Sequence, residues 1–399
     1  MKYVVILGDG MADYPTEALG GKTPLDVAQK PYMDMLASKG ELGLVKTVPD
    51  DLPPGSDVAN LSVMGYNPYK FYTGRSPLEA VSMGIDLGSE DTSFRTNLVM
   101  LSDEADYSKK TMLDYSADEI TTAEAHELIN AVNKELKNDI LSFYGGISYR
   151  HLLVWHKCDK QFRLTPPHDI SNKVITEYLP DSEIILDLMK RSYDILKDHP
   201  INKARVERGL HPANSIWIWG QGKKPELTSF KEKYGIDGVV ISAVDLVKGI
   251  GICSQMRSID VVGATGNIHT NFDAKAQATI DALDSADFAY VHIEAPDECG
   301  HRFEVDNKVR SIELIDEKII KPIFEALSAK NEPFSIMVLP DHATPLSLGT
   351  HVNDAVPFAI YKSDDIKVSE LDYNETDATE GKYIADGYTL MDYFIGGNK

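Results

Sequence analysis

Three short runs of apolar residues form the clearest pattern in this chain. They are YVVILGDG at 3–10, FAYVHIEAPD at 288–297 and SIMVLPDH at 335–342. Each run is rich in Val, Ile, Leu or aromatic residues, and glycine or proline ends it. This composition is typical of a strand that is buried on both faces of a parallel sheet. The pattern therefore predicts three buried strands.

Apolar residues at helical spacing lie between and beside these runs. Isoleucine and valine recur every three or four residues over 308–327, and the segment DAKAQATIDALDSAD directly precedes the second run. Both patterns predict amphipathic helices. Buried strands that alternate with helices are typical of an α/β fold. We therefore expect a parallel-rich sheet sandwiched by helices.

The middle of the chain follows a different pattern. Amphipathic helices are predicted there over 117–136 and 183–197, among polar and aromatic segments. A chain of 399 residues also exceeds the size of one simple hydrophobic core. We expect a discontinuous core domain formed by residues 1–90 and 220–399, with a smaller α+β cap domain inserted over 91–219.

An acidic residue follows each of the three predicted strands, and histidines follow the second and the third. The carboxyl ends of parallel strands meet at one edge of a sheet, where ligands bind, so we expect these side chains to converge. If Pro296 begins a helix, the acid and the histidine that follow it four residues apart share one helix face. The residues concerned are Asp9, Asp297, His301, Asp341, His342 and His351.

This donor set predicts a site for two metal ions. Three carboxylates and three imidazoles exceed the three protein ligands that a catalytic zinc usually takes. Paired ions that share a site are typical of phosphoryl-transfer enzymes. Carboxylate and imidazole ligands without thiolate suit Mn²⁺, Zn²⁺ or Mg²⁺, and the sequence does not choose between them.

Ser56 lies in the segment PPGSDVANLSVMGY at 53–66, which has the pattern of a turn followed by a helix. One interpretation is a nucleophile whose hydroxyl pKa is lowered by a bound metal, with the phosphate oxygens held by N–H groups of the helix N-terminus. The other is that Ser56 is only the N-cap of that helix. The local sequence leaves both open.

Two residues beside the predicted ligands need separate interpretation. Cys299 lies between Asp297 and His301, but at two residues' distance it points off their helix face, so we expect it to pack in the core. His292 lies within the second strand and is expected to fill the core. A hydrogen bond from His292 to a metal ligand is the alternative.

The composition limits which classes of partner the protein can bind and indicates its cellular compartment. A net charge of −22 argues against nucleic acid or an anionic membrane as partner. The three cysteines are far apart, which argues against a disulfide framework. No signal segment and no apolar run of about 20 residues is present. We therefore expect a reduced, soluble, cytoplasmic protein. Its oligomeric state is not set by the sequence.

Several motifs taken together carry a family resemblance: GDGMADYP, PPGSDVANLSVMGY, YTGRSPLEA, APDECGH and PDHATPLSLGTH. They resemble the archaeal-type branch of cofactor-independent phosphoglycerate mutase, within the alkaline phosphatase superfamily. The resemblance implies an alkaline-phosphatase-like core, two divalent metals with Mn²⁺ foremost, and a small phosphorylated acid as substrate. It implies the interconversion of 3-phosphoglycerate and 2-phosphoglycerate through a phosphoserine.

The resemblance also implies roles for individual residues. Ser56 is the expected nucleophile, and Lys248 is expected to stabilise the transferring phosphate. The inserted domain is expected to enclose the glycerate while it reorients. The first metal is implied to bind Asp9, Ser56, Asp341 and His342. The second metal is implied to bind Asp297, His301 and His351.

The substrate contacts are where this chain departs from the bacterial members of the family. Those members carry an arginine-rich stretch at the return into the core, whereas this chain has WIWGQGKKP there. We select Arg75, Arg150 and His151 as the substrate-binding candidates. For each of them a surface charge or a core histidine is the alternative.

Three other functions stay open at this point. Relatives close to this branch have been proposed as homoserine kinases, which would use ATP at the same metal and serine site. A metal-dependent phosphohydrolase would result if water entered the site. A sensor without catalysis is the third, and it requires that Ser56→Ala leaves every activity unchanged.

Overall fold

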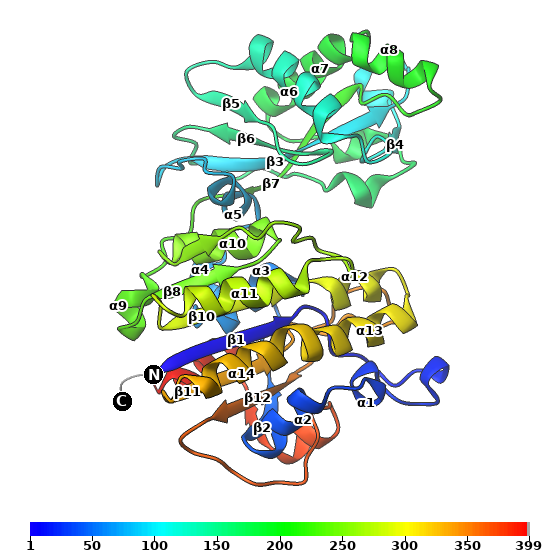
Figure 1. Ribbon diagram of the computed structural model, residues 1–399. Coiled ribbons are helices and arrows are strands. Elements are labelled where there is room, and N and C mark those ends of the chain that lie inside the picture. The colour runs from blue at the N-terminus through cyan, green and yellow to red at the C-terminus, as the bar shows by residue number, and fades with distance from the viewer. Residues whose placement is uncertain (397–399) are drawn as a thin grey trace. The chain divides into compact units, whose positions relative to one another are not determined.

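The computed structural model describes residues 1–396 (Figure 1). The chain forms two compact units. The core unit consists of Met1–Tyr72 together with the chain from Glu226 onward, and the inserted unit consists of Thr73–Pro225. No helix in the described part of the chain combines the length and apolarity that crossing a membrane requires.

The core unit is built on an eight-stranded sheet in the order β13-β2-β12-β11-β1-β10-β8-β9. Neighbouring strands from β11 to β9 are parallel, whereas β12 runs antiparallel to both β11 and β2. The strands are β1 Lys2–Gly8, β2 Glu41–Val45, β8 Gly238–Ile241, β9 Arg257–Ile259, β10 Phe288–Ile293, β11 Phe334–Leu339, β12 Val356–Lys362 and β13 Lys382–Ile384.

The three predicted strands are confirmed, and they are neighbours. They correspond to β1, β10 and β11, with β1 in the middle and parallel to both partners. Ile6 of β1 pairs with Val291 on one side and with Val338 on the other, and all three are fully buried. Continuous apolar runs are therefore explained by burial on both sheet faces.

Helices cover both faces of this sheet, as predicted. One face packs in an apolar cluster with residues of α2, α11, α13 and α14 (Figure 1). The helix predicted over 308–327 lies within a longer helical stretch: α13 leads through a π-helical turn at Asp316–Ile320 into α14. The helices are α1 Pro24–Val27, α2 Pro31–Ser38, α3 Ser56–Val63, α4 Pro68–Phe71, α9 Phe230–Tyr234, α10 Asp245–Cys253, α11 Phe272–Ala282, α12 Ala295–His301, α13 Val305–Ile315, α14 Lys321–Ala329 and α15 Leu390–Ile395.

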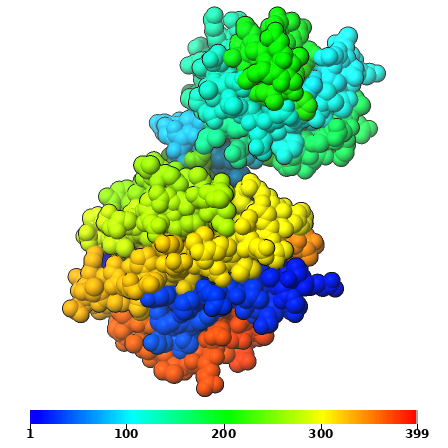
Figure 2. Space-filling model, turned by 45° about the vertical axis from the view of Figure 1, so that its right-hand side comes forward, coloured from blue at the N-terminus to red at the C-terminus, as the bar shows by residue number. Residues whose placement is uncertain are grey.

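Both ends of the sequence build the core unit. β2, from the first fifty residues, pairs with β12 and β13 from the last fifty. Figure 2 shows the same adjacency at the surface, where the blue N-terminal segment lies against orange and red C-terminal segments. The core unit is therefore closed by contacts between residues that are more than 300 positions apart.

The inserted unit is a smaller α+β layer with its own apolar cluster. Its central strand β3 is antiparallel to β4, β6 and β7, and β6 is antiparallel to β5. The elements are α5 Ser76–Ser82, β3 Thr92–Leu101, β4 Met112–Asp114, α6 Thr122–Leu136, β5 Leu141–Tyr144, β6 Arg150–Trp155, α7 Glu183–Leu196, α8 Pro200–Glu207 and β7 Ser215–Gly222.

Two boundaries in this unit differ from the predicted ones. The predicted insertion was 91–219, but α5 also packs against β3 and β7, and the Ser76 hydroxyl donates to the Ser93 carbonyl at 3.0 Å. The helix predicted from residue 117 begins only at Thr122, because residues 117–119 have positive φ angles. Thr121 then caps this helix by accepting from the Glu124 N–H.

Truncation of a buried side chain in the three-strand centre is expected to destabilise the core unit. Ile336→Ala on β11 removes a fully buried side chain from the apolar cluster, so we expect a loss of about 2–5 kcal/mol in the free energy of unfolding. Urea denaturation followed by circular dichroism measures it. Val368→Ala, at a position 91% exposed, is the control, and equal midpoints for the two variants would contradict the assignment of this core.

Candidate active site

Three neighbouring strand ends bring three carboxylates together at one edge of the core sheet. Asp9 follows β1, Asp297 lies in α12 directly after β10, and Asp341 follows β11. All three are buried. The Asp9 N–H donates to the last carbonyl of β10 at 2.9 Å, and the Gly10 N–H donates to the Asp341 carboxylate at 3.2 Å. Backbone contacts between the strand ends therefore set the spacing of the acids.

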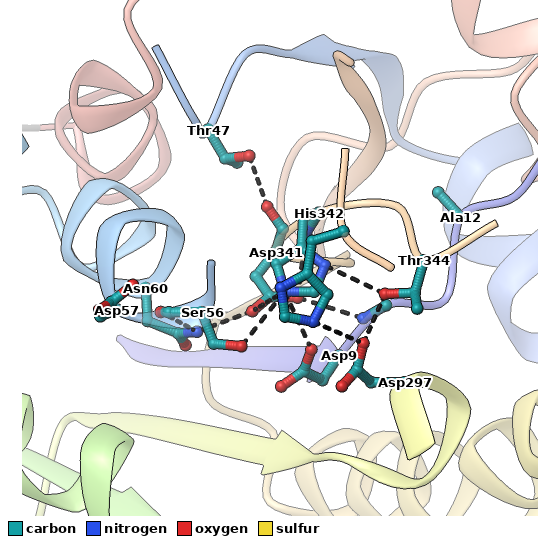
Figure 3. A network of polar contacts seen from close by, with 12 residues as sticks. Asp9, Ala12, Thr47, Ser56, Asp57, Asn60, Asp297, Asp341, His342 and Thr344 are labelled. Carbon is teal, nitrogen blue, oxygen red and sulfur yellow. Dashed lines mark hydrogen bonds and ion pairs between the residues drawn. The ribbon is translucent and has the colours of Figure 1, made fainter. Parts of the chain in front are cut away.

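Ser56 and His342 complete the first group of donors (Figure 3). The Ser56 Oγ lies 3.2 Å from His342 Nε2. The same nitrogen lies 3.5 Å from Asp9 Oδ1 and 3.5 Å from Asp341 Oδ2. One cation could therefore reach the hydroxyl, the imidazole and two carboxylates at once.

The second group consists of Asp297, His301 and His351. Pro296 lies in the first turn of α12, which places Asp297 and His301 on one helix face, with 3.1 Å between Oδ2 and Nε2. His351 Nε2 lies 3.3 Å from Asp297 Oδ1 and 2.9 Å from His301 Nε2. Two imidazoles and one carboxylate thus face a common point, as the ligands of a second cation would.

The electrostatics of the site fit divalent cations. Burial raises the pKa of Asp9 well above its usual range, and the charges of Asp341 and Asp297 raise it further. Burial also raises the pKa of Asp297, but hydrogen bonds with His301 and His351 outweigh it and hold that pKa well below its usual range. Asp9 Oδ1 is buried and has no hydrogen-bond partner. A buried carboxylate oxygen without a donor is costly unless a cation binds it.

Thr344 sets the protonation pattern of His342. The Thr344 hydroxyl donates to Asp297 Oδ1, since that carboxylate can only accept. Its oxygen therefore accepts from His342 Nδ1–H, which lies 3.3 Å away. Burial lowers the pKa of His342, so the ring is neutral. The lone pair of Nε2 consequently faces Ser56 and the two carboxylates, which is the orientation of a metal ligand.

Ser56 is not the N-cap of its helix, so that interpretation is wrong. Gly55 occupies the N-cap position and has no side chain to cap the helix, and Ser56 is the first residue of α3. Its hydroxyl is directed toward His342 instead (Figure 3). Because it is not used for capping, the hydroxyl is available for chemistry.

His292 supports the site from below. It is fully buried, its Nε2 donates to Asp9 Oδ2 at 2.9 Å, and its Nδ1 lies 3.2 Å from the Ser242 Oγ. Burial lowers the pKa of His292 to about 3, so the ring is neutral. His292 was expected to fill the core, with a hydrogen bond to a predicted metal ligand as the alternative. The contact with Asp9 confirms the alternative.

Cys299 packs in the core, as expected. It is buried on α12 and lies outside the groups of possible metal ligands among the described residues. Burial raises the pKa of the Cys299 thiol to about 12, so it is neither a thiolate ligand nor a nucleophile at neutral pH.

Sequence reasoning missed a buried ion pair beneath the site. The ammonium group of Lys308, fully buried on α13, lies 2.6 Å from the Asp13 carboxylate and donates to the Thr344 carbonyl at 2.7 Å. Asp13 also accepts from the Leu346 N–H at 3.1 Å. This pair joins the loop after β1 to the loop after β11. The available signal was a lysine at the start of an otherwise apolar helix face.

Lys248 lies on α10, and its ammonium group pairs with the Asp260 carboxylate at 2.6 Å. The side chain of Asp260 is 86% exposed. The Lys248 ammonium group thus contacts Asp260, and its expected contact with a phosphate stays a prediction.

In the inserted unit, three arginines gather around one glutamate, and we call Arg75, Arg95 and Arg150 the arginine group. Glu79 lies 2.9 Å from Arg75 Nε and 3.1 Å from Arg95 Nε. Burial raises the pKa of Glu79, but the charges of the arginine group hold it below its usual value. Three guanidinium groups around one carboxylate leave a surplus of positive charge, which suits an anionic ligand.

The structure separates His151 from this arginine group. His151 and Arg150 are consecutive residues of β6, so their side chains lie on opposite faces of the sheet. His151 is buried, and its Nδ1 accepts from the Gly146 N–H at 3.0 Å. Burial lowers the pKa of His151 to about 3, so the ring is neutral. Sequence adjacency to Arg150 was a misleading signal.

Comparisons with known proteins identify the family to which this sequence and fold are similar. Residues 37–202 match the family model described as 2,3-bisphosphoglycerate-independent phosphoglycerate mutase. Proteins of that name from Methanosarcina barkeri and Methanothrix thermoacetophila are similar to this chain. The first is 51% identical over 91% of each chain, and the second is 48% identical over 100% of each chain.

Two solved structures share the fold. A protein from Pyrococcus horikoshii is 28% identical, with a TM-score of 0.84 over 100% of this chain and 98% of that one. The cofactor-independent phosphoglycerate mutase from Thermoplasma acidophilum is 26% identical, with a TM-score of 0.67 over 99% of each chain. The predicted fold class and the resemblance stated from the motifs are thereby confirmed.

Removal of one buried charge is expected to stabilise the metal-free protein. Asp9→Asn keeps the shape of the side chain and an acceptor for His292, but it removes the cost of burying a charge and the repulsion with Asp341 and Asp297. Since one unit of pKa shift corresponds to about 1.4 kcal/mol, we expect a gain of about 1 kcal/mol or more in unfolding free energy after chelation. Thermal unfolding in EDTA measures it.

The same substitution is expected to abolish most of the stabilisation that added Mn²⁺ gives to the wild type. Asp237→Asn, at an exposed carboxylate paired with Lys231, serves as the control for the loss of a negative charge. A metal-free Asp9→Asn protein that is less stable than the wild type would contradict the repulsion.

Proposed function

Because the chain belongs to the 2,3-bisphosphoglycerate-independent phosphoglycerate mutase family, we propose that it interconverts 3-phosphoglycerate and 2-phosphoglycerate through a phosphoserine at Ser56. The observation that carries this proposal is the Ser56 hydroxyl at 3.2 Å from His342 Nε2, beside two buried carboxylates. The enzyme is an isomerase, and we assign its reaction to glycolysis in the cytoplasm.

We propose that two divalent metal ions bind at the strand ends. One is held by Asp9, Ser56, Asp341 and His342. The other is held by Asp297, His301 and His351. Mn²⁺ is our first choice, and Zn²⁺ and Mg²⁺ suit the same donors. When bound, such ions lower the pKa of a coordinated hydroxyl and balance the charge of a phosphoryl group.

The residues around Ser56 have separate roles in the proposed phosphoryl transfer. Ser56 gives up its hydroxyl proton and its oxygen forms a bond to phosphorus, while the bond from phosphorus to the substrate oxygen breaks and that oxygen takes up a proton. The other hydroxyl of the glycerate then gives up its proton and attacks the phosphoserine, and the Ser56 oxygen leaves and is protonated again. The first turn of α3 presents backbone N–H groups that favour phosphate oxygens. His292 holds Asp9, and Thr344 holds His342 and Asp297, so the donors do not have to reorganise.

Lys248 keeps its proposed role of stabilising the transferring phosphate. Its present partner Asp260 is 86% exposed, and ion pairs with an exposed partner contribute little to stability. The ammonium group can therefore leave Asp260 for a phosphate at small cost.

We propose that the arginine group binds the negative charges of the substrate. Arg75 and Arg150 keep the role proposed for them, and Arg95 joins them because it shares Glu79 with Arg75. Planar guanidinium groups bind carboxylate and phosphate through two parallel hydrogen bonds. We assign no substrate contact to His151, since its neutral ring is buried on the other face of β6.

Replacement of the nucleophile is expected to abolish the reaction. Ser56→Ala should lower kcat at least 10³-fold, because no other hydroxyl replaces a covalent nucleophile. A coupled assay with Mn²⁺ and 3-phosphoglycerate, in which enolase reports 2-phosphoglycerate, measures turnover, and mass spectrometry detects the phosphoserine. Ser62→Ala, a buried serine on the same helix, is the matched control.

A parallel reaction with ATP and homoserine tests the kinase alternative. ADP formation there, without turnover of 3-phosphoglycerate, would overturn the mutase assignment and keep Ser56 as nucleophile. Release of free phosphate without 2-phosphoglycerate would indicate a phosphohydrolase. Full activity of Ser56→Ala would contradict the nucleophile.

Loss of one guanidinium group is expected to weaken substrate binding. Arg150→Gln should raise KM for 3-phosphoglycerate about tenfold or more, since a charge-assisted hydrogen bond contributes about 1.5–3 kcal/mol. Initial rates over a range of substrate concentrations give KM and kcat. Arg191→Gln on α7, where Arg191 pairs with Asp187 on the surface, controls for the change in net charge. Equal KM values for the two variants would refute the proposed contact between Arg150 and the substrate.

A further inference from the structure

Two polar side chains lie on one face of β10, the strand beside β1. Its Ala289, Val291 and Ile293 belong to the apolar cluster on one sheet face. Tyr290 and His292 alternate with them and therefore lie on the opposite face. His292 contacts Asp9, as described above, while the Tyr290 hydroxyl donates to Asn60 Oδ1 at 2.7 Å.

Asn60 connects the nucleophile to a carboxylate of the first donor group (Figure 3). Its Nδ2 donates to the Ser56 carbonyl at 2.8 Å and to Asp341 Oδ2 at 2.9 Å. Asn60, Tyr290 and Asp341 are all fully buried. Both amide hydrogens and the amide oxygen are thus used without water.

The orientation of this amide has one solution. Both the Ser56 carbonyl and the Asp341 carboxylate can only accept, so the NH₂ group must face them. The Oδ1 must then face Tyr290, whose hydroxyl is the donor. Burial, with the charges of Asp341 and Asp9, raises the pKa of Tyr290 well above its usual range, so the phenol keeps its proton at neutral pH.

We propose that Tyr290 and Asn60 form a positioning pair that holds the nucleophile against the Asp341 carboxylate. The proposal rests on the function proposed for Ser56. The Ser56 carbonyl belongs to the residue whose hydroxyl reacts, and Asp341 is a ligand proposed for the same metal. A single rigid amide therefore couples the start of α3 to the end of β11.

The origin of this rigidity is the central strand. Tyr290 pairs in register with Val5 of β1 and with Val240 of β8, so its backbone is held on both sides. Its hydroxyl transfers that position to Asn60. Without this hydroxyl the buried Asn60 Oδ1 loses this donor, and the amide is held only through its NH₂ group, so it positions Ser56 against Asp341 less firmly.

The experiment compares two single variants and their double variant by activity and by metal binding. Tyr290→Phe removes only the hydroxyl, and Asn60→Leu removes the amide while it keeps the branched arrangement of the side-chain heavy atoms. For Tyr290→Phe we expect kcat with 3-phosphoglycerate to fall about tenfold, Mn²⁺ affinity of the chelator-treated protein to fall about tenfold, and KM to stay within twofold. Asn60→Leu should lower kcat and Mn²⁺ affinity further than Tyr290→Phe does.

The double variant tests whether Tyr290 acts through Asn60. In the Asn60→Leu background, Tyr290→Phe should change kcat and Mn²⁺ affinity less than twofold, because the contact is already lost. Effects that multiply independently in the double variant would overturn the proposal.

Tyr373→Phe is the matched control for loss of a buried phenol hydroxyl. Tyr373 is also fully buried in the core unit, and its hydroxyl donates to the Pro357 carbonyl at 3.0 Å. It should lower the unfolding temperature much as Tyr290→Phe does and leave kcat and Mn²⁺ affinity unchanged. If Tyr290→Phe also leaves both unchanged, the positioning role is refuted. A wild type without mutase turnover would refute the proposed function, while the Mn²⁺ measurements would still test the pair.

Discussion

Three carboxylates share one buried edge of the core sheet, and their mutual repulsion is the constraint around which the rest of the site is arranged. Asp9, Asp297 and Asp341 are brought together because β1, β10 and β11 are adjacent parallel strands. Burial of like charges is costly unless donors or cations compensate it. Each acid therefore has a dedicated donor: His292 for Asp9, Thr344 for Asp297 and Asn60 for Asp341. One oxygen of Asp9 is left without any, and it faces the place where we propose a cation.

The surrounding structure resists this repulsion mechanically. The strands are apolar on both faces and locked in register, so they cannot separate without exposing the core. The loops after the strands are joined by the buried pair of Lys308 and Asp13. Removal of either partner would leave an uncompensated buried charge. Stability of the scaffold is thus used to hold a site that is unstable by itself, which is common for catalytic centres.

The sequence predicted what depends on order along the chain. Asp9, Asp297 and Asp341 follow their strands directly, so strand prediction was sufficient to bring them together. The sequence did not predict contacts that depend on which helix packs against a given face of the sheet. Asn60 meets Tyr290 because α3 packs over that side of β10, and no local pattern encodes this. Arg150 and His151 show the same limit, because neighbours in a strand lie on opposite faces. The boundary at α5 was missed because its contacts lie in β3 and β7.

The positions of single protons follow from these contacts and extend through the whole site. The Thr344 hydroxyl has one hydrogen to donate, and Asp297 accepts that hydrogen bond, so His342 must keep a proton on Nδ1 and present a bare Nε2 to Ser56. On the other side, the Tyr290 hydroxyl donates a hydrogen bond to Asn60 Oδ1, so the amide presents N–H to Asp341. The donors Thr344 and Asn60 thus serve Asp297 and Asp341, while the bare Nε2 of His342 faces the serine. The two groups of donors are consequently one network, and a change in the hydroxyl of Thr344 would alter both.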